Sequence, residues 1–201
     1  MLKSLFAALA GAFVLIAAGV APAAADGGYK ALPLDVVIGK PGAPVTVIEY
    51  FSMTCPHCAR FAANILPRVE KEWIDTGKAM LVLRDFPLDD VALAAAMVAH
   101  CAGPRYETFV DTLFQTQETW ATAKDPIAEI KTIVRLGGMR GEDVDACLKK
   151  NDLLNEINTG KEEATRKYGI DSTPSFIING KLASGEMSYE EFAALLAAAS
   201  K

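Results

Sequence analysis

The sequence predicts an α/β protein that carries an inserted α-helical domain. Residues 45–51 and 79–85 are apolar runs typical of buried strands, and a helical stretch separates them. From 89 to 168 the pattern is helical without a strand signal, and a hairpin and a last helix then follow. We therefore expect an α/β domain at 26–88 and 169–201 and a helical insertion at 89–168.

The N-terminus has the layout of a secretory signal peptide. A start containing Lys3 precedes the uncharged apolar run Leu5–Val20, and small residues continue to Ala25. An uncleaved membrane anchor is the alternative, but that run falls short of the ~20 apolar residues that span a bilayer. We expect cleavage after Ala25, which removes one positive charge and changes the net charge from −5 to −6. The mature protein is then expected in the periplasm, where disulfides persist.

Composition excludes several classes of protein. With 201 residues, 51% hydrophobic and 22% charged, the chain is too apolar to be disordered and long enough to bury a substantial core. The negative net charge and the lack of a basic run argue against nucleic-acid binding through phosphate neutralisation. Four cysteines are too few for a small disulfide-packed domain.

The first α/β elements follow a Pro-punctuated extended stretch that ends at Pro44. Val45–Phe51 is β-branched and aromatic, which predicts a strand covered on both faces. A helix is expected to begin at Cys55 and to run to about Trp73, before a second strand at Ala79–Asp85. A strand-helix-strand unit of this kind predicts parallel strands with a right-handed crossover.

The insertion is divided by recognisable helix starts and stops. Asp89-Asp90 opens an Ala-rich helix that Gly103-Pro104 ends. Asp125-Pro126 caps a later helix, and Gly137-Gly138 stops it. Helices are expected at about 105–116, 126–136, 141–149 and 152–168.

The C-terminal part predicts a hairpin followed by a helix. Asn179-Gly180 lies between the apolar runs Pro174–Ile178 and Lys181–Ala183, and both turn positions require a positive φ. Ser188–Glu191 is a capping box, which places the start of the last helix.

Two cysteines lie where the first strand gives way to the first helix. Cys55 falls at the helix N-terminus, where free backbone N–H groups and the helix dipole favour a thiolate. Pro56 fits the first turn, and Cys58 lies one turn on, within disulfide reach. His57 is expected to stabilise the Cys55 thiolate as an imidazolium. A stabilised thiolate favours the dithiol, so the Cys55–Cys58 disulfide is expected to be oxidising.

Two other interpretations of this motif are weaker. A structural bridge across so short a loop adds little chain-entropy stabilisation. A zinc site built on Cys55, His57 and Cys58 lacks a second ligand pair at suitable spacing. His100 and Cys101 are next to each other in the sequence and lie far from the motif. We therefore expect a redox-active disulfide with no metal and no other cofactor.

Phe51–Cys58 after a buried strand resembles the thioredoxin superfamily, and the histidine and helical insertion make the chain similar to DsbA-type thiol:disulfide oxidoreductases. The resemblance covers roughly residues 40–200, and Gly169–Gly180 matches the second family motif. It implies a thioredoxin fold with an inserted α-helical domain. It also implies that Thr173-Pro174 is a cis-proline loop facing Cys55, so that Pro56, Thr173 and Pro174 contact substrate. The direction in which Thr173 tunes the site stays open.

Glu49 is a third candidate for a catalytic role, because an unpaired carboxylate in an apolar strand is costly. In the family an acid at this position lies beneath the active site, which implies that Glu49 exchanges a proton with Cys58. A carboxylate that reaches solvent at a sheet edge is the alternative.

Cys101 and Cys147 form the remaining pair, and an even cysteine count in an oxidising compartment favours a structural disulfide. Some DsbA relatives carry such a bridge in the helical domain. Two free buried thiols, or a second redox relay, are the alternatives.

The resemblance implies an exported dithiol oxidase that oxidises reduced secreted proteins and is itself reoxidised by a quinone-linked membrane partner of DsbB type. A disulfide isomerase or reductant could use the same motif, although isomerases of this superfamily usually carry an N-terminal dimerisation domain. Fewer than twenty residues separate Ala25 from the first core strand, so a monomer is expected. A peptide-binding chaperone module is an alternative from another class.

Overall fold

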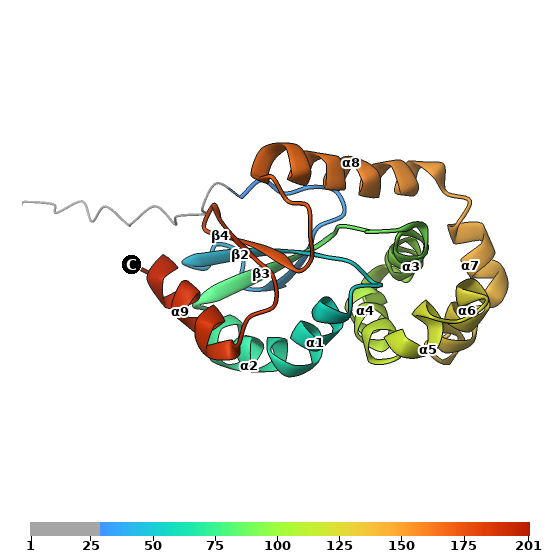
Figure 1. The fold of residues 1–201 in the computed structure, drawn as a ribbon, viewed down its shortest axis with the longest axis horizontal. Helices are drawn as coiled ribbons and strands as arrows, with labels where there is room; N and C mark the ends of the chain where they lie inside the picture. The colour runs from blue at the N-terminus through green and yellow to red at the C-terminus, as the bar shows by residue number, and fades with distance from the viewer. Residues whose placement is uncertain (1–28) are drawn as a thin grey trace, which may run out of the picture.

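The computed structural model describes residues 29–201, so the predicted signal peptide at 1–25 lies outside the described residues. A five-stranded mixed sheet with strand order β1-β3-β2-β4-β5 forms the centre of the molecule (Figure 1). Helices pack on both faces of this sheet and gather beyond one end of it (Figure 1). The predicted α/β class is confirmed.

The strands are β1 (Val36–Gly39), β2 (Val45–Phe51), β3 (Ala79–Asp85), β4 (Ser175–Ile178) and β5 (Lys181–Ser184). As predicted, β2 and β3 are parallel, and β4 and β5 form an antiparallel hairpin around Asn179 and Gly180, which both have positive φ. Strand β1 was not predicted. It is only four residues long and lies between prolines, so its pairing with β3 is what makes it a strand.

The helices are α1 (Pro56–Asn64), α2 (Leu66–Val69), α3 (Asp90–Cys101), α4 (Tyr106–Gln115), α5 (Gln117–Ala121), α6 (Pro126–Leu136), α7 (Gly141–Cys147), α8 (Asn151–Tyr168) and α9 (Tyr189–Ala199). The prediction of one continuous helix from Cys55 to about Trp73 is wrong. The helix is interrupted at Ile65, between α1 and α2, and a π-helical turn follows α2 at Glu70–Ile74. Pro67 explains the break, because it has no N–H to donate to the preceding turn.

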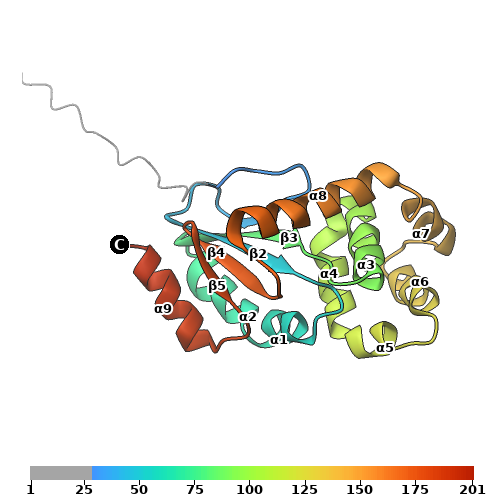
Figure 2. The ribbon, with the colours of Figure 1, turned by 45° about the horizontal axis from the view of Figure 1, so that its top comes forward.

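Alternation along β2 sends its side chains to two separate cores. Ile48 and Tyr50 pack in a cluster with Ala164 of α8, whereas Val47 and Phe51 belong to a cluster with residues of α1, α4 and α9. Figures 1 and 2 show α8 along one face of the sheet and α1, α2 and α9 on the other. Glu49 shares the α1 side with Val47 and Phe51.

The helices α3–α7 gather at one end of the sheet (Figures 1 and 2). A buried polar contact joins this group to β3, because Asp85 Oδ2 lies 2.7 Å from His100 Nε2 of α3 and accepts from the Tyr106 hydroxyl of α4 at 3.2 Å. The sequence assigned no role to His100. In the structure it helps to fix the helical segment against the end of β3.

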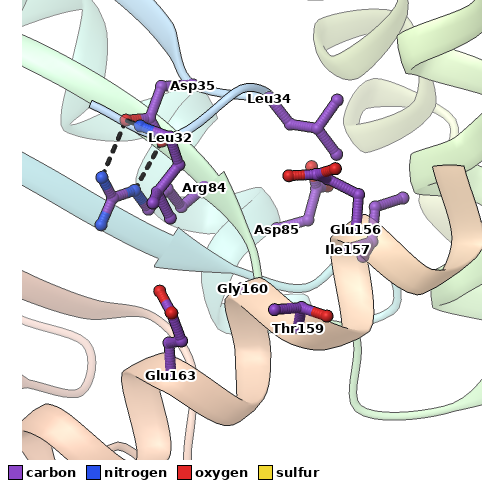
Figure 3. Close-up of a pocket in the computed structure, with 10 residues that line it drawn as sticks. All are labelled: Leu32, Leu34, Asp35, Arg84, Asp85, Glu156, Ile157, Thr159, Gly160 and Glu163. Carbon is purple, nitrogen blue, oxygen red and sulfur yellow. Dashed lines mark hydrogen bonds and ion pairs between the residues drawn. The ribbon is translucent and has the colours of Figure 1, made fainter. Parts of the chain in front are cut away.

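The segment before β1 is fastened to the sheet by a buried ion pair. Arg84 donates to both carboxylate oxygens of Asp35 through Nε and Nη2. Its Nη2 also donates to the Lys30 carbonyl, and its Nη1 donates to the Tyr50 hydroxyl. Figure 3 shows this pair at a pocket of about 130 Å³, which α8 closes with Ile157 and neighbouring residues. Among residues 29–201, no helix has the length and apolar character needed to cross a bilayer.

Candidate active site

The cysteine motif lies where β2 ends and α1 begins, as predicted. Cys55 is the N-cap residue of α1 and Pro56 occupies the first turn. The Cys55 N–H donates to the Ser52 carbonyl at 3.0 Å, which holds the turn in place. Both cysteines are free thiols, with Cys55 5% exposed and Cys58 fully buried. Cys55 is therefore the sulfur that a partner molecule can reach.

The Thr173–Pro174 loop lies directly against Cys55. The peptide bond between these residues is cis, and the Cys55 Sγ lies 3.2 Å from the Thr173 carbonyl oxygen. This proximity follows from the sheet, because β4 pairs with β2 through Ser175 and Tyr50 just before the motif. Pro174 and Thr173 are buried and Pro56 is exposed, so the three residues expected to contact substrate lie close to the reactive sulfur at different depths.

The surroundings of Cys55 favour its thiolate. A hydrogen bond from the Cys58 thiol is the largest cause, and it lowers the pKa of Cys55 to about 5 against the opposing effect of burial. The Thr173 side chain and the backbone N–H groups of Cys58 and His57 lower this pKa further. The Thr173 hydroxyl is buried and has no hydrogen-bond partner in the described part of the chain, so it is available to donate to the thiolate.

Cys58 has the opposite character. Burial, the hydrogen bond to Cys55 and the negative charges of Cys55 and Glu49 all raise the pKa of the Cys58 thiol. Glu49 lies in the central strand and is 3% exposed, and burial raises its pKa to about 8. This placement differs from a carboxylate that reaches solvent at a sheet edge. At neutral pH the pair is therefore a thiolate at Cys55 and a thiol at Cys58, with a protonated carboxyl nearby.

The His57 ring makes its contacts with the loop before α9. Its Nδ1 lies 2.6 Å from the Glu186 carboxylate, and Arg60 donates two bonds of 2.7 Å to the same carboxylate. The three side chains are about half exposed. The His57 backbone N–H is among the groups that lower the pKa of Cys55, and the contribution of the imidazolium ring stays a prediction. No sequence signal links Glu186 to the motif, which lies 126–129 residues away.

Gln117 is a second residue that the sequence did not indicate. It lies in α5 and is 7% exposed, and its side-chain amide donates to the carbonyls of Met53 and Cys55 at 2.7 and 3.0 Å. These carbonyls belong to the turn that presents Cys55. A helix of the insertion therefore holds the active-site turn directly.

The structure joins Cys101 at the end of α3 to Cys147 at the end of α7 in a disulfide. Cys147 packs with Ala96, Met97 and Ile157, and Cys101 packs both against this cluster and against the larger one that contains Cys55 and Cys58. The bridge therefore connects two helices of the insertion, and neither of its cysteines belongs to the redox motif.

Among residues 29–201, no cluster of three or more His, Cys, Asp or Glu side chains is arranged to hold a metal ion. The pocket in Figure 3 has no lining residue from the cysteine motif, so it is separate from this chemistry.

Comparison with known proteins decides the family. A model of the thioredoxin family matches residues 32–198, which is most of the chain. The chain belongs to the thioredoxin family. The family match spans the sheet, the cysteine motif and the proline loop as well as α3–α8, which lie between β3 and β4.

The relatives of this thioredoxin-family protein indicate the DsbA type. A Rickettsia bellii protein named protein-disulfide oxidoreductase is 31% identical over 73% of this chain and 57% of its own length. Disulfide bond formation protein D of Bacillus subtilis is 25% identical over 82% of this chain and 76% of its own. The crystal structure of Wolbachia pipientis alpha-DsbA1 has a TM-score of 0.78 and 28% identity, covering 88% of this chain and 96% of that one. The resemblance to DsbA-type proteins is confirmed. The chain spans a little over half the length of the rickettsial relatives that it matches.

Proposed function

We propose that this protein is an exported dithiol oxidase that donates the Cys55–Cys58 disulfide to reduced, folding proteins. The observation that carries the proposal is the asymmetry of the pair. Cys55 lies at a helix N-terminus beside Thr173, whereas Cys58 is fully buried. An accessible, stabilised thiolate makes Cys55 both the site of attack and a good leaving group.

The reaction then runs in two exchanges. A substrate thiolate attacks Cys55 Sγ, the Cys55–Cys58 bond breaks, and Cys58 leaves as a thiolate that takes a proton from Glu49. A second substrate thiolate attacks the substrate sulfur of the mixed disulfide, and Cys55 leaves as its stable thiolate. The substrate gains a disulfide and the enzyme becomes a dithiol. Thr173 and Pro174 form the surface against which an extended substrate segment lies beside Cys55.

The cellular setting is part of the same proposal. Cleavage after Ala25 exports the chain to the periplasm, its partners are reduced secreted proteins, and a quinone-linked membrane protein of DsbB type reoxidises the dithiol. The protein works as a monomer without metal or cofactor, and Cys101–Cys147 is a structural bridge. N-terminal sequencing of the protein purified from the periplasmic fraction tests the cleavage site.

The test of the activity uses a reduced, unfolded protein that contains two cysteines. Stoichiometric oxidised enzyme is expected to remove two thiols from this substrate. Cys58→Ser, carrying a small thiol in a mixed disulfide at Cys55, is expected to exchange it for a single-cysteine version of the substrate and to hold that substrate as a mixed disulfide. Cys55→Ser is expected to do neither. A Cys55→Ser variant that retains full effect on substrate folding would indicate a chaperone. Faster rearrangement of scrambled disulfides than oxidation of thiols would indicate an isomerase.

A further inference from the structure

Glu49 is buried but not paired. It is 3% exposed, and no hydrogen bond to its carboxyl group occurs among residues 29–201. Its charge acts on two buried groups, the Cys58 thiol and the Tyr106 hydroxyl. Burial alone makes such a carboxyl costly to ionise. A proton that moves between Glu49 and Cys58 must also reach solvent, so the surroundings of Glu49 decide how fast that happens.

A small cavity begins at Glu49. Its volume is about 30 Å³, and its polar walls are the side chains of Glu49, Glu70, Glu107 and Asp111. The remaining walls are apolar. Because a water molecule needs roughly 10–15 Å³ of such volume and two or more polar partners, this cavity is large enough for about two waters between carboxyl groups.

The cavity continues to the surface. Glu70 and Asp111 also line a wider groove of about 370 Å³, whose other walls include Pro67 of α2 and Gln115 of α4. Glu70 is half-buried, whereas Glu107 and Asp111 are exposed. The same two acids therefore face both the enclosed space beside Glu49 and the open groove.

The three outer acids have no cation partner. Within residues 29–201, no ion pair involves Glu70, Glu107 or Asp111. Burial and the neighbouring charges raise the pKa of Glu70 and of Glu107, and burial raises that of Asp111. Each raised pKa lies closer to neutral pH than that of an ordinary surface acid. At neutral pH these carboxyl groups therefore accept a proton more readily than an ordinary surface acid does, and they can release it again.

We propose that Glu70 and Asp111, assisted by Glu107, form the outer end of a proton route that joins Glu49 to solvent through this cavity. The proposal rests on the proposed exchange of a proton between Glu49 and Cys58. It extends that function to Glu70 of the π-helical turn and to Glu107 and Asp111 of α4.

Protons move in both directions along this route. When substrate is oxidised, the leaving Cys58 thiolate takes the proton of Glu49, and the Glu49 carboxylate is reprotonated from solvent through Glu70 or Asp111. When the enzyme is reoxidised, Glu49 first releases its proton to solvent through the same acids. The Glu49 carboxylate then takes the proton of Cys58, whose thiolate attacks Cys55 Sγ in the mixed disulfide and expels the sulfur of the oxidant as a thiolate. The electrons travel only between sulfur atoms.

The experiment isolates the step in which Cys58 is deprotonated. Reduced protein is mixed with saturating oxidised glutathione, and acid-quenched samples are analysed by mass spectrometry for the Cys55–glutathione mixed disulfide. Its first-order decay reports attack by Cys58. We expect the double variant Glu70→Gln/Asp111→Asn to slow this decay roughly tenfold in dilute buffer. Concentrated imidazole is expected to restore the rate, because a small buffer replaces the missing acids.

Two further variants make the result decisive. Glu118→Gln/Glu162→Gln removes the same charge from exposed positions outside the cavity, and its decay rate is expected to match that of the unmodified protein. Glu49→Gln is expected to slow the decay by about 100-fold or more. If the mixed disulfide decays slowly in Glu49→Gln but at the normal rate in Glu70→Gln/Asp111→Asn, the route is wrong and the proton exchange between Glu49 and Cys58 stands. If the decay in Glu49→Gln is not slowed, that exchange itself is wrong. Slowing of the double variant that imidazole does not relieve also contradicts the route.

Discussion

Cys55 and Cys58 carry the same chemical group in opposite environments. Cys55 has a pKa of about 5, and the pKa of Cys58 is raised, so reduction at neutral pH binds one proton, at Cys58. Below pH 5 it binds two. We predict that the reduction potential falls by about 30 mV per pH unit between pH 6 and 8, and by about 60 mV per unit below pH 5. Glutathione equilibration across this pH range measures the slope, and 60 mV per unit up to pH 8 would mean that Cys55 is an ordinary thiol.

The Glu49 carboxyl group has a proposed function in proton exchange, and its ionisation also lowers the stability of the folded protein. Its pKa is raised from 4.5 to about 8 in the folded protein, so ionisation opposes folding from about pH 4.5 upwards, and the full cost is reached above pH 8. We predict that Glu49→Gln raises the free energy of unfolding at pH 8 by about 3 kcal/mol or more. Near pH 4 the gain disappears. Urea unfolding of both proteins at the two pH values checks this, and a gain that is equal at both would contradict the assignment.

At the element scale, α5 supports the active-site turn through one side chain. Gln117 donates to two carbonyls of that turn. Gln117→Leu leaves the Met53 carbonyl without a partner, whereas the Cys55 carbonyl keeps its bond from the Ala59 N–H. We predict a loss of about 1–3 kcal/mol in the free energy of unfolding, because a buried unpaired carbonyl costs roughly that amount. Urea unfolding measures the loss. Gln115→Leu, at an exposed position of α4, is the matched control and is expected to change stability by less than about 0.5 kcal/mol. Equal effects in the two variants would argue against a supporting role for Gln117.

Local patterns predicted the elements that have local causes. The hairpin turn at Asn179-Gly180 and the start of α1 at Cys55 follow from residues that are adjacent in the chain. Strand β1 was missed because its pairing with β3 joins residues more than forty positions apart. The prediction of one helix from Cys55 to Trp73 gave too little weight to Pro67. The missing N–H of Pro67 interrupts the hydrogen bonds between successive turns of a helix.

The candidate site also contains residues that local sequence patterns identify and residues that only the tertiary structure identifies. Cys55, Cys58 and the Thr173-Pro174 loop could be found because each belongs to a contiguous motif. Glu186 and Gln117 could not, because their roles depend on how the loop before α9 and helix α5 meet the motif in space. A single glutamate in a loop, or a single glutamine at the start of a helix, carries no sequence signal of its partner. Tertiary packing, which the sequence pattern does not encode locally, gives these residues their function.

At the scale of the whole molecule, the Cys101–Cys147 disulfide ties α3 to α7 across 46 residues. The chain-entropy model gives about 4 kcal/mol for closing a loop of this length. We therefore predict that Cys101→Ser/Cys147→Ser lowers the free energy of unfolding by about 4 kcal/mol in urea titrations. The rate at which Cys55 reacts with an alkylating reagent is expected to be unchanged, because Cys147 packs in a separate cluster and Cys101 is only partly buried against the cluster that contains Cys55. Altered Cys55 reactivity would show that the bridge also shapes the active site.

The insertion and the sheet act as one unit around the motif. Gln117 holds the turn, and Asp85 joins β3 to His100 and Tyr106 of the insertion. Acids of α4 line the cavity that begins at Glu49. The helical segment therefore does more than enlarge the family fold. It supplies groups that position the cysteine pair and, in our proposal, conduct its protons.

The most direct test of the account is the reduction potential of the Cys55–Cys58 pair at pH 7. The protein is equilibrated with glutathione couples of known ratio, and the free thiols are counted. A stabilised Cys55 thiolate predicts a value well above about −180 mV, as expected of a disulfide donor. A value near the −270 mV that is typical of thioredoxin would identify a reductant and would contradict the proposed oxidase.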